Sequence, residues 1–164
     1  MCKNIIVGQS GGPTAVINGS LYGVVSEGLN HPDKIGHVYG MINGIEGFLH
    51  GHMMDIGALA ATNELELIRT TPGAYLGSCR YKLPEDLSDP VYPQLFRIFE
   101  EQEIGYFFYI GGNDSMDTVS KLSRYAAGID SDIRFIGIPK TIDNDLVETD
   151  HTPGYGSAAK YVAS

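Results

Sequence analysis

Cysteine is scarce in this chain, which has only Cys2 and Cys79 among its 164 residues. Cys2 lies next to the N-terminus, and Cys79 lies in a polar segment between Ser78 and Arg80. These settings argue against a disulfide framework and against a cysteine zinc site. The five histidines also lack the spacing of a zinc site, so we expect them in loops or on the surface. We therefore expect a cytoplasmic protein.

Basic residues are also few, with 11 Lys and Arg against 20 Asp and Glu, which gives a formal net charge of −9. This deficit weakens any long-range attraction to nucleic acid, so no nucleic-acid partner is expected. An acidic chain still binds phosphates locally, through helix N-termini, a few Lys or Arg and a divalent cation. No apolar run approaches the roughly 18 residues of a membrane span, and no signal peptide precedes the first predicted strand, so no membrane partner is expected.

The remaining composition is that of one globular domain. Hydrophobic residues make up 43% of the chain and charged residues 19%, as in a soluble fold with its own core. The 21 glycines lie mostly where apolar runs end, as expected of loops that approach a ligand closely. The chain shows no internal repeat and no linker, so we expect a single domain over residues 1–164.

Apolar runs that predict strands alternate with helical patterns along the chain. The predicted strands are 3–7, 35–39, 106–110 and 134–138, and the predicted helices are 17–29, 58–69, 91–103, 114–126 and 157–164. Residues 40–52 and 71–82 are expected to be irregular. The run Tyr106 to Ile110 is apolar and aromatic throughout, which is typical of a central parallel strand buried on both faces. The alternation predicts an α/β fold with a doubly wound, mostly parallel sheet and helices on both faces.

Three polar loops follow predicted strands: Ser10–Thr14, Gly111–Ser115 and Pro139–Asp145. Ligands of open α/β sheets bind at the carboxyl ends of the strands, where these loops are expected to meet. One glycine pair after a strand, such as Gly11-Gly12, is often only a tight turn. Three such loops in one sheet instead predict a phosphate or nucleotide site.

The loop from Gly111 to Ser115 offers a phosphate site at the start of a helix. Gly111 and Gly112 carry no Cβ, so a ligand can reach the backbone. Ser115 can cap the helix and offer its hydroxyl to a phosphate. Asp114 lies inside the turn and would repel an α-phosphate unless a cation intervened, so we expect it to be functional. Asp117 is interpreted instead as a residue that the helix dipole favours.

The segment from Lys140 to Asp145 contains the groups that phosphoryl transfer to an alcohol requires. Such a transfer needs a carboxylate that accepts the hydroxyl proton, positive charge near the moving phosphoryl group and usually Mg²⁺. Two carboxylates, a hydroxyl, an amide and the Lys140 ammonium are candidates for every role except that of the metal. The alternative is a plain turn after a strand, where Asp and Asn are common.

Over essentially its whole length, the chain resembles the phosphofructokinases, which phosphorylate the 1-hydroxyl of fructose 6-phosphate. The resemblance is carried by Ser10-Gly11-Gly12, Asn18 and the segments 75–80, 110–115, 140–145 and 152–157, of which Thr-Ile-Asp-Asn-Asp is the most specific. It implies a Rossmann-like N-terminal domain that binds the phosphoryl donor. Family members continue with a second domain that supplies most sugar-phosphate contacts, so we expect residues 1–164 to be truncated at the C-terminus, without that substrate domain.

The resemblance also implies a role for each candidate site residue. Asp143 is the base, and Lys140 and Asp114 complete the catalytic set. The donor-binding residues are Gly11, Gly12, Arg80, Gly112 and Ser115, and the substrate-binding residues are Thr141, Ile142, Asp143 and Asp145. The expected cofactor is Mg²⁺, which the family usually holds with an Asp where this chain has Asn113. Asn113 is neutral and Mg²⁺ prefers carboxylate or phosphate oxygens, so Asn113 and Asp114 are both candidate ligands.

Asp114 and Lys140 bear on the identity of the phosphoryl donor. ATP-using phosphofructokinases usually have Gly at both positions, whereas pyrophosphate-using members have Asp and Lys. Asp114 would close the space for an α-phosphate, and Lys140 would supply positive charge. The resemblance therefore implies transfer from pyrophosphate to fructose 6-phosphate, giving fructose 1,6-bisphosphate in a reversible step of glycolysis.

Alternatives to this interpretation remain open. One is a 6-phosphofructokinase that uses ATP, and another is a non-catalytic phosphate-binding fragment that holds only part of the acceptor site. An NAD or lipid kinase is a weaker alternative, because those enzymes lack Thr-Ile-Asp-Asn-Asp. We expect the full-length enzyme to be a homo-oligomer and this chain by itself to be inactive.

Overall fold

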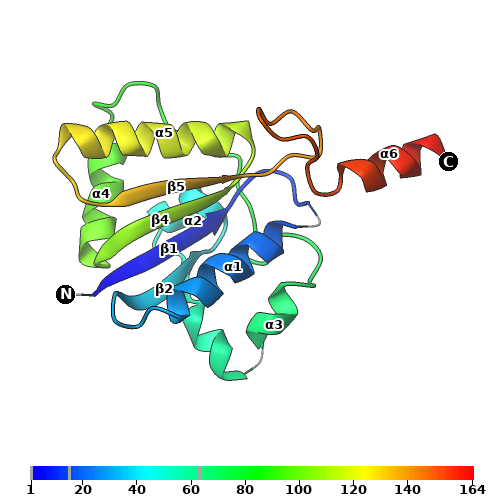
Figure 1. Ribbon diagram of the computed structural model, residues 1–164. Coiled ribbons are helices and arrows are strands. Elements are labelled where there is room, and N and C mark those ends of the chain that lie inside the picture. Colours follow the sequence, from blue (N-terminus) through cyan, green and yellow to red (C-terminus); the bar gives the residue numbers. More distant parts are fainter. Residues whose placement is uncertain (1, 15, 63) are drawn as a thin grey trace.

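A five-stranded sheet lies at the centre of the computed structural model, which describes residues 2–14, 16–62 and 64–164 (Figure 1). The strands, in the spatial order β3-β2-β1-β4-β5, are β1 (Lys3–Gln9), β2 (Ile35–Met41), β3 (Met53–Asp55), β4 (Ile104–Gly111) and β5 (Arg134–Pro139). All neighbouring pairs are parallel except β2 and β3. The predicted doubly wound, mostly parallel α/β fold is confirmed.

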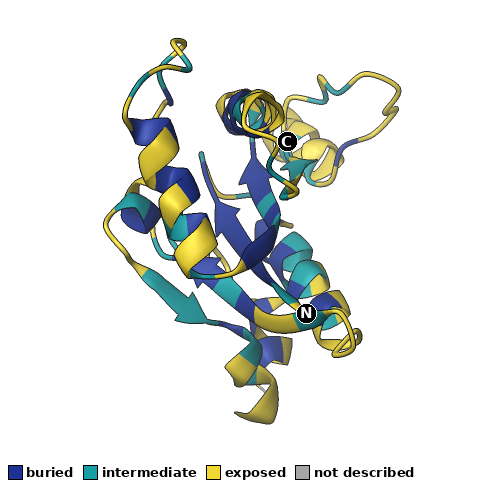
Figure 2. Cartoon of the chain, turned by 90° about the vertical axis from the view of Figure 1, so that its left-hand side faces the viewer, coloured by how far each residue is buried: buried dark blue, intermediate teal, exposed yellow. Residues whose placement is uncertain are grey.

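Helices cover both faces of this sheet. One face carries α1 (Ile17–Leu29) and α3 (Glu64–Ile68), and the other carries α2 (Gly44–Leu49), α4 (Val91–Glu101) and α5 (Asn113–Gly128). The last helix, α6 (Tyr155–Ala163), projects away from the sheet and has no buried residue (Figures 1 and 2). The layers follow from right-handed crossovers, because β1 leads to β2 in one direction and β4 leads to β5 in the other.

Alternating strand side chains divide the core between the two faces. Ile5 and Val7 pack under α1, whereas Ile6 lies in the core under α2, α4 and α5. Ile6 is opposite Phe107, and Phe107 is opposite Phe135, so one apolar row crosses three strands. Figure 2 shows the result, with burial concentrated in the strands and in the inner sides of the helices.

The expectation of irregular structure over residues 40–52 is wrong. β2 continues to Met41, and the six residues Gly44–Leu49 then form the helix α2. Four glycines lower the helix propensity of this segment, but Ile45 and Phe48 are spaced three apart and fully buried in the core with α4. Tertiary packing therefore overrides local propensity here. The short antiparallel strand β3 was not predicted either.

The segment predicted as a helix over 58–69 is not one continuous helix. Gly57–Thr62 forms a 3₁₀ helix without a buried residue, and α3 covers only Glu64–Ile68. Residue 63 lies outside the described residues. Only Leu65 and Ile68 are buried, so a regular helix is supported by packing only at this end. The other predicted helices and strands are present, with ends that differ by at most a few residues.

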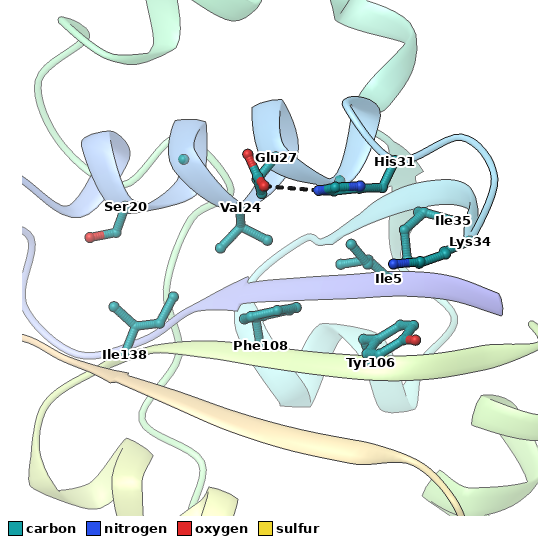
Figure 3. Close-up of a pocket in the computed structure, with 12 residues that line it drawn as sticks. Ile5, Ser20, Val24, Glu27, His31, Lys34, Ile35, Tyr106, Phe108 and Ile138 are labelled. Carbon is teal, nitrogen blue, oxygen red and sulfur yellow. Dashed lines mark hydrogen bonds and ion pairs between the residues drawn. The ribbon is translucent and has the colours of Figure 1, made fainter.

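The central strand β4 is buried fully on only one face, contrary to expectation. Phe107 and Tyr109 are buried, whereas Tyr106 and Phe108 are partly exposed. The latter two point toward α1 in an apolar groove of about 550 Å³ between α1 and the strands (Figure 3). No helix among the described residues is both long enough and apolar enough to cross a lipid bilayer.

Replacing Phe99 with alanine tests the aromatic core. This fully buried ring contacts Phe48, Phe96 and Phe107, with centroid distances of 5.4, 5.4 and 5.7 Å. We expect Phe99→Ala to lower the free energy of unfolding by about 3–5 kcal/mol, because the lost ring leaves a cavity. Urea denaturation measures this loss. The control Leu67→Ala, at a 65% exposed position, should change stability by less than about 0.5 kcal/mol. Equal effects of the two substitutions would contradict the assignment of Phe99 to the buried core.

Candidate active site

Four polar loops meet at the carboxyl edge of the sheet. They follow β1, β4 and β5 or reach the edge from the segment between α3 and α4, and they comprise residues 10–14, 76–82, 111–115 and 140–145. The backbone N–H of Ser10 donates to the Ile110 carbonyl over 2.9 Å, and that of Lys140 donates to the Gly111 carbonyl over 2.9 Å. Strand pairing therefore fixes three of the loops relative to one another.

The fourth loop is held by a buried pair of amides, Gln9 and Asn18, which are 0% and 1% exposed. Gln9 Nε2 donates to Asn18 Oδ1 over 2.9 Å, and Gln9 Oε1 accepts from the Leu76 N–H over 2.9 Å. Asn18 Oδ1 also accepts from the Tyr75 N–H, and Asn18 Nδ2 donates to the Thr71 carbonyl. Buried amides need such partners, so this network anchors the loop to β1 and α1.

Gln9 was not among the predicted functional residues. The signal in the sequence was a polar side chain at the end of an otherwise apolar strand.

The loop then attaches directly to the glycine turn after β1. Ser78 Oγ donates to the Gly11 carbonyl over 2.6 Å, and Ser10 Oγ donates to the Cys79 carbonyl over 3.3 Å. Cys79 is a buried free thiol, and its Sγ lies 3.7 Å from the Tyr109 hydroxyl. These contacts place the residues that follow Cys79 opposite the start of α5.

A first cavity, of about 550 Å³, lies between these loops. Its lining residues are Ser10, Gly11, Gly12, Cys79, Arg80, Tyr81, Lys82, Gly112, Asn113, Asp114, Ser115 and Lys140. It contains every residue predicted to bind the donor. Three of the eleven Lys and Arg side chains of this acidic chain line it, so positive charge is concentrated at the edge where the N-terminus of α5 also points.

Asp114 is paired with Lys82, which is not among the predicted site residues. Lys82 Nζ lies 3.0 Å from Asp114 Oδ1, and the two side chains are 67% and 72% exposed. Their separation in sequence explains why this pairing could not be read from the local pattern. The ion pair partly neutralises a carboxylate that would otherwise repel any phosphate in the cavity.

Lys140 lines both the first cavity and a second one beside it. Partial burial lowers the pKa of Lys140, because removal from water disfavours the charged form. A bound phosphate would supply the opposite charge that this ammonium lacks among the ion pairs of the described residues.

The second cavity, of about 280 Å³, brings together the residues predicted to face the acceptor. Thr141, Ile142, Asp143 and Asp145 line it together with Pro13 and Thr14, and it shares Gly12, Gly112, Asn113 and Lys140 with the first cavity. Asp143 is exposed, and its backbone N–H donates to Thr141 Oγ1 over 2.9 Å. Its carboxylate is therefore accessible to an incoming hydroxyl.

Asn144 has a structural place in this loop. Its Oδ1 accepts from the Thr152 N–H over 2.7 Å, and its Nδ2 donates to the Asp150 carbonyl over 3.2 Å. The side chain thus links the two ends of the loop between β5 and α6 by hydrogen bonds.

Ser115 does not cap the next helix as expected. α5 begins at Asn113, its N-cap is Gly112, and no side chain caps it, because the chain turns into the helix two residues before Ser115. Ser115 is buried in the cavity wall, and a Cβ at position 111 would collide with its Oγ. Gly111 is therefore required for packing, whereas a Cβ at Gly112 would meet only the Lys140 carbonyl oxygen, at 3.9 Å. Asp117 lines neither cavity, in keeping with its interpretation as a helix residue.

The described residues contain no group of three or more His, Cys, Asp or Glu side chains arranged to hold a metal ion. At the first cavity the chain offers the Asp114 carboxylate and the Asn113 amide oxygen. Mg²⁺ is commonly held by one or two protein ligands together with substrate phosphates and water. This donor set fits a metal ion shared with a bound phosphate and does not fit an all-protein cage.

One family model matches residues 4–164 of the chain, and it describes the phosphofructokinases. The pyrophosphate–fructose 6-phosphate 1-phosphotransferase of Rhodospirillum rubrum is 48% identical over 160 residues, which cover 97% of this chain and 38% of that protein. The ATP-dependent 6-phosphofructokinase of Photobacterium profundum is 34% identical over 162 residues, which cover 99% and 46% of the two chains. This chain thus spans less than half the length of either relative.

A solved structure that resembles this chain is also a phosphofructokinase. The crystal structure of the pyrophosphate-dependent phosphofructokinase from Nitrosospira multiformis is similar, with a TM-score of 0.88 and 43% identity. The match covers 98% of this chain and 39% of that one.

Alanine at Gly11 and at Gly12 should have different effects. Gly11 has a φ of +76°, so we expect Gly11→Ala to lower the free energy of unfolding by about 1–2 kcal/mol through backbone strain. A Cβ at Gly12 meets no atom within 4 Å, so Gly12→Ala should leave stability unchanged. Its methyl group would instead occupy space open to a ligand and should weaken the binding of a phosphate-bearing ligand at this turn. Thermal denaturation and a pyrophosphate titration measure both effects, and full-strength binding by Gly12→Ala would argue against a ligand at this turn.

Proposed function

We propose a function for this chain from one premise, which is that it belongs to the phosphofructokinase family. We propose that it binds the phosphoryl donor and carries the base of an enzyme that transfers a phosphoryl group from pyrophosphate to the 1-hydroxyl of fructose 6-phosphate. The products are fructose 1,6-bisphosphate and orthophosphate. The observation that carries this proposal is the charge arrangement of the two adjoining cavities, with the Lys82–Asp114 pair in one, Asp143 in the other and Lys140 in both.

Pyrophosphate fits the first cavity better than ATP does. Arg80, Lys82 and Lys140 supply positive charge for a compact, highly charged anion, and Gly12 and the N-terminus of α5 supply backbone N–H groups. The Asp114 carboxylate stands in the same wall and would repel a further phosphate of a nucleotide. In support, the relative named for pyrophosphate is 48% identical, and the relative named for ATP is 34% identical.

The second cavity then receives the sugar hydroxyl. Asp143 accepts the proton of the 1-hydroxyl while the hydroxyl oxygen forms a bond to the nearer phosphorus of pyrophosphate. The bridging P–O bond of pyrophosphate breaks, and orthophosphate leaves in the first cavity. Lys140, which lines both cavities, lies where it can offset the negative charge on the transferring group. Thr141, Ile142 and Asp145 are assigned to the acceptor side.

Mg²⁺ is part of the proposal. Asn113 and Asp114 would hold it together with phosphate oxygens, and it would draw negative charge away from the phosphoryl group. The weaker protein ligand set, with an amide in place of a second carboxylate, is compatible with a metal ion that enters together with pyrophosphate.

The rest of the enzyme is also a proposal, because this chain spans 38% of the length of the Rhodospirillum rubrum relative. We assign most contacts with the sugar phosphate to a second domain, and we place the complete enzyme in the cytoplasm as a homo-oligomer that works reversibly in glycolysis. Residues 1–164 alone would then hold the donor site and base but be inactive. A non-catalytic phosphate-binding fragment is the alternative if the natural chain has no such domain.

A donor assay on the full-length gene product tests the charge argument. We expect kcat/KM with pyrophosphate to exceed that with ATP by about 100-fold or more, because a carboxylate facing the α-phosphate costs several kcal/mol. The double variant Asp114→Gly, Lys140→Gly should lose pyrophosphate activity and gain use of ATP. Asp132→Gly, which removes an exposed carboxylate far from both cavities, is the matched control. A wild type that uses ATP and ignores pyrophosphate would sink the proposal.

The role of Asp143 as the base can be measured in the same enzyme. We expect Asp143→Asn to lower kcat by about 10²–10⁴-fold with a much smaller effect on either KM, because the amide cannot accept the hydroxyl proton. Asp150→Asn, at an exposed position of the same loop outside both cavities, should retain activity. If Asp143→Asn kept most of its kcat, the base would have to be another group.

A further inference from the structure

A buried lysine lies behind the first cavity. Lys121, on α5, has a side chain that is only 3% exposed. Its Nζ donates to the Leu83 carbonyl over 3.0 Å, and it contacts Glu85 Oε1 and Asp117 Oδ2 at 2.6 Å each. An ammonium group has three protons to donate, and each has a partner here. Lys121 lines neither cavity, so it does not touch the proposed substrates.

Burying the ammonium group of Lys121 carries a desolvation cost. Burial disfavours an ammonium ion unless hydrogen bonds and opposite charges compensate, and an apolar side chain of similar size would avoid that cost. The hydrogen bonds that Lys121 donates to the carboxylates of Asp117 and Glu85 raise its pKa, so the group stays charged. The contact with the Leu83 carbonyl is what an apolar residue could not make.

That carbonyl belongs to the segment that forms one wall of the first cavity. Leu83 directly follows Lys82, and Arg80 lies three residues earlier. The opposite wall is the start of α5, where Asp114 lies two helical turns before Lys121. One helix therefore holds the segment at two points, through Asp114 to Lys82 and through Lys121 to Leu83.

The two attachments are unequal. The Lys82–Asp114 pair is largely exposed, and exposed pairs hold a geometry weakly. The hydrogen bond from Lys121 to the Leu83 carbonyl is buried, although the side chains of its carboxylate partners Glu85 and Asp117 are 85% and 50% exposed. This buried hydrogen bond therefore sets where the segment lies. We propose that Lys121 is a positioning residue for the phosphoryl donor, because it holds residues 80–83 against α5 and so fixes Arg80 and Lys82 across the cavity from Asp114. Only the identity of the donor rests on the proposed function.

Steady-state kinetics of Lys121→Met in the full-length enzyme is the first test. Methionine keeps the length of the side chain and removes the three hydrogen bonds. We expect KM for pyrophosphate to rise about tenfold or more, as for other residues that orient a ligand-binding group, while KM for fructose 6-phosphate stays near its wild-type value. Lys121→Arg keeps the charge and the donors and should restore most of the affinity for pyrophosphate.

Two controls separate positioning from a general loss of stability. Val25→Ala removes buried volume from the core on the other face of the sheet and should lower Tm without changing the ratio of the two KM values. In a double-mutant cycle, Lys82→Met should have a smaller effect when Lys121 is already methionine, because Lys121 acts through the segment that carries Lys82. Fully additive effects would count against that coupling.

A second readout does not depend on the donor. Cys79 is a buried free thiol directly before residues 80–83, and its alkylation by iodoacetamide can be followed by peptide mass spectrometry. Lys121→Met should speed alkylation of Cys79 well beyond the rate in Val25→Ala. If the wild type failed to use pyrophosphate, the proposed function would fall while this readout still tested the positioning role. KM ratios and Cys79 rates equal to those of Val25→Ala would overturn the inference.

The inference stays testable if Lys121→Met does not fold. Asp117→Asn, at a half-exposed position outside both cavities, removes one carboxylate that holds the ammonium. It should produce the same changes in smaller degree. An Asp117→Asn enzyme with unchanged KM for pyrophosphate and unchanged Cys79 reactivity would then contradict the role of Lys121.

Discussion

The buried pair of Gln9 and Asn18 is the constraint on which the cavities depend. The two amides bind each other and also bind the backbone of the loop between α3 and α4 at Thr71, Tyr75 and Leu76. Without them, buried polar groups of that loop would be unpaired, and the loop would keep only the hydrogen bonds of Ser10 and Ser78 at the turn after β1. Because they hold it, the segment from Ser78 onward reaches the glycine turn and brings Arg80 and Lys82 to the edge of the sheet.

This arrangement explains how an acidic chain can offer a site for a polyanion. The net charge of −9 gives no general attraction to phosphates, so binding must come from local placement of a few cations. Strand pairing supplies Lys140, the amide-held loop supplies Arg80 and Lys82, and α5 supplies its N-terminus. In the proposed function, the carboxylate of Asp114 at the start of α5 would repel a further phosphate, which would link the size of the donor to the Lys82–Asp114 ion pair.

Much of the fold and most of the candidate site could be predicted from the sequence, because both depend on local patterns. Apolar runs mark β1, β4 and β5, and the loops that follow them are fixed to one edge by parallel pairing. Features set by distant contacts could not be predicted. Lys82 pairs with Asp114 across 32 positions of sequence, and α2 forms because Ile45 and Phe48 pack into the core. Ser115 is buried because it packs closely against Gly111. Tyr106 and Phe108 were expected to be buried because the strand that carries them is apolar throughout. Their exposure depends on how closely α1 packs over the sheet, and a groove remains between α1 and the strands.

A crystal structure of the full-length protein with pyrophosphate and Mg²⁺ most directly tests whether the first cavity is the donor site. We predict one pyrophosphate between the Gly11-Gly12 turn and α5, with its oxygens bound by Arg80, Lys82 and Lys140. Pyrophosphate bound elsewhere, or an empty first cavity at a concentration that saturates activity, would contradict this assignment.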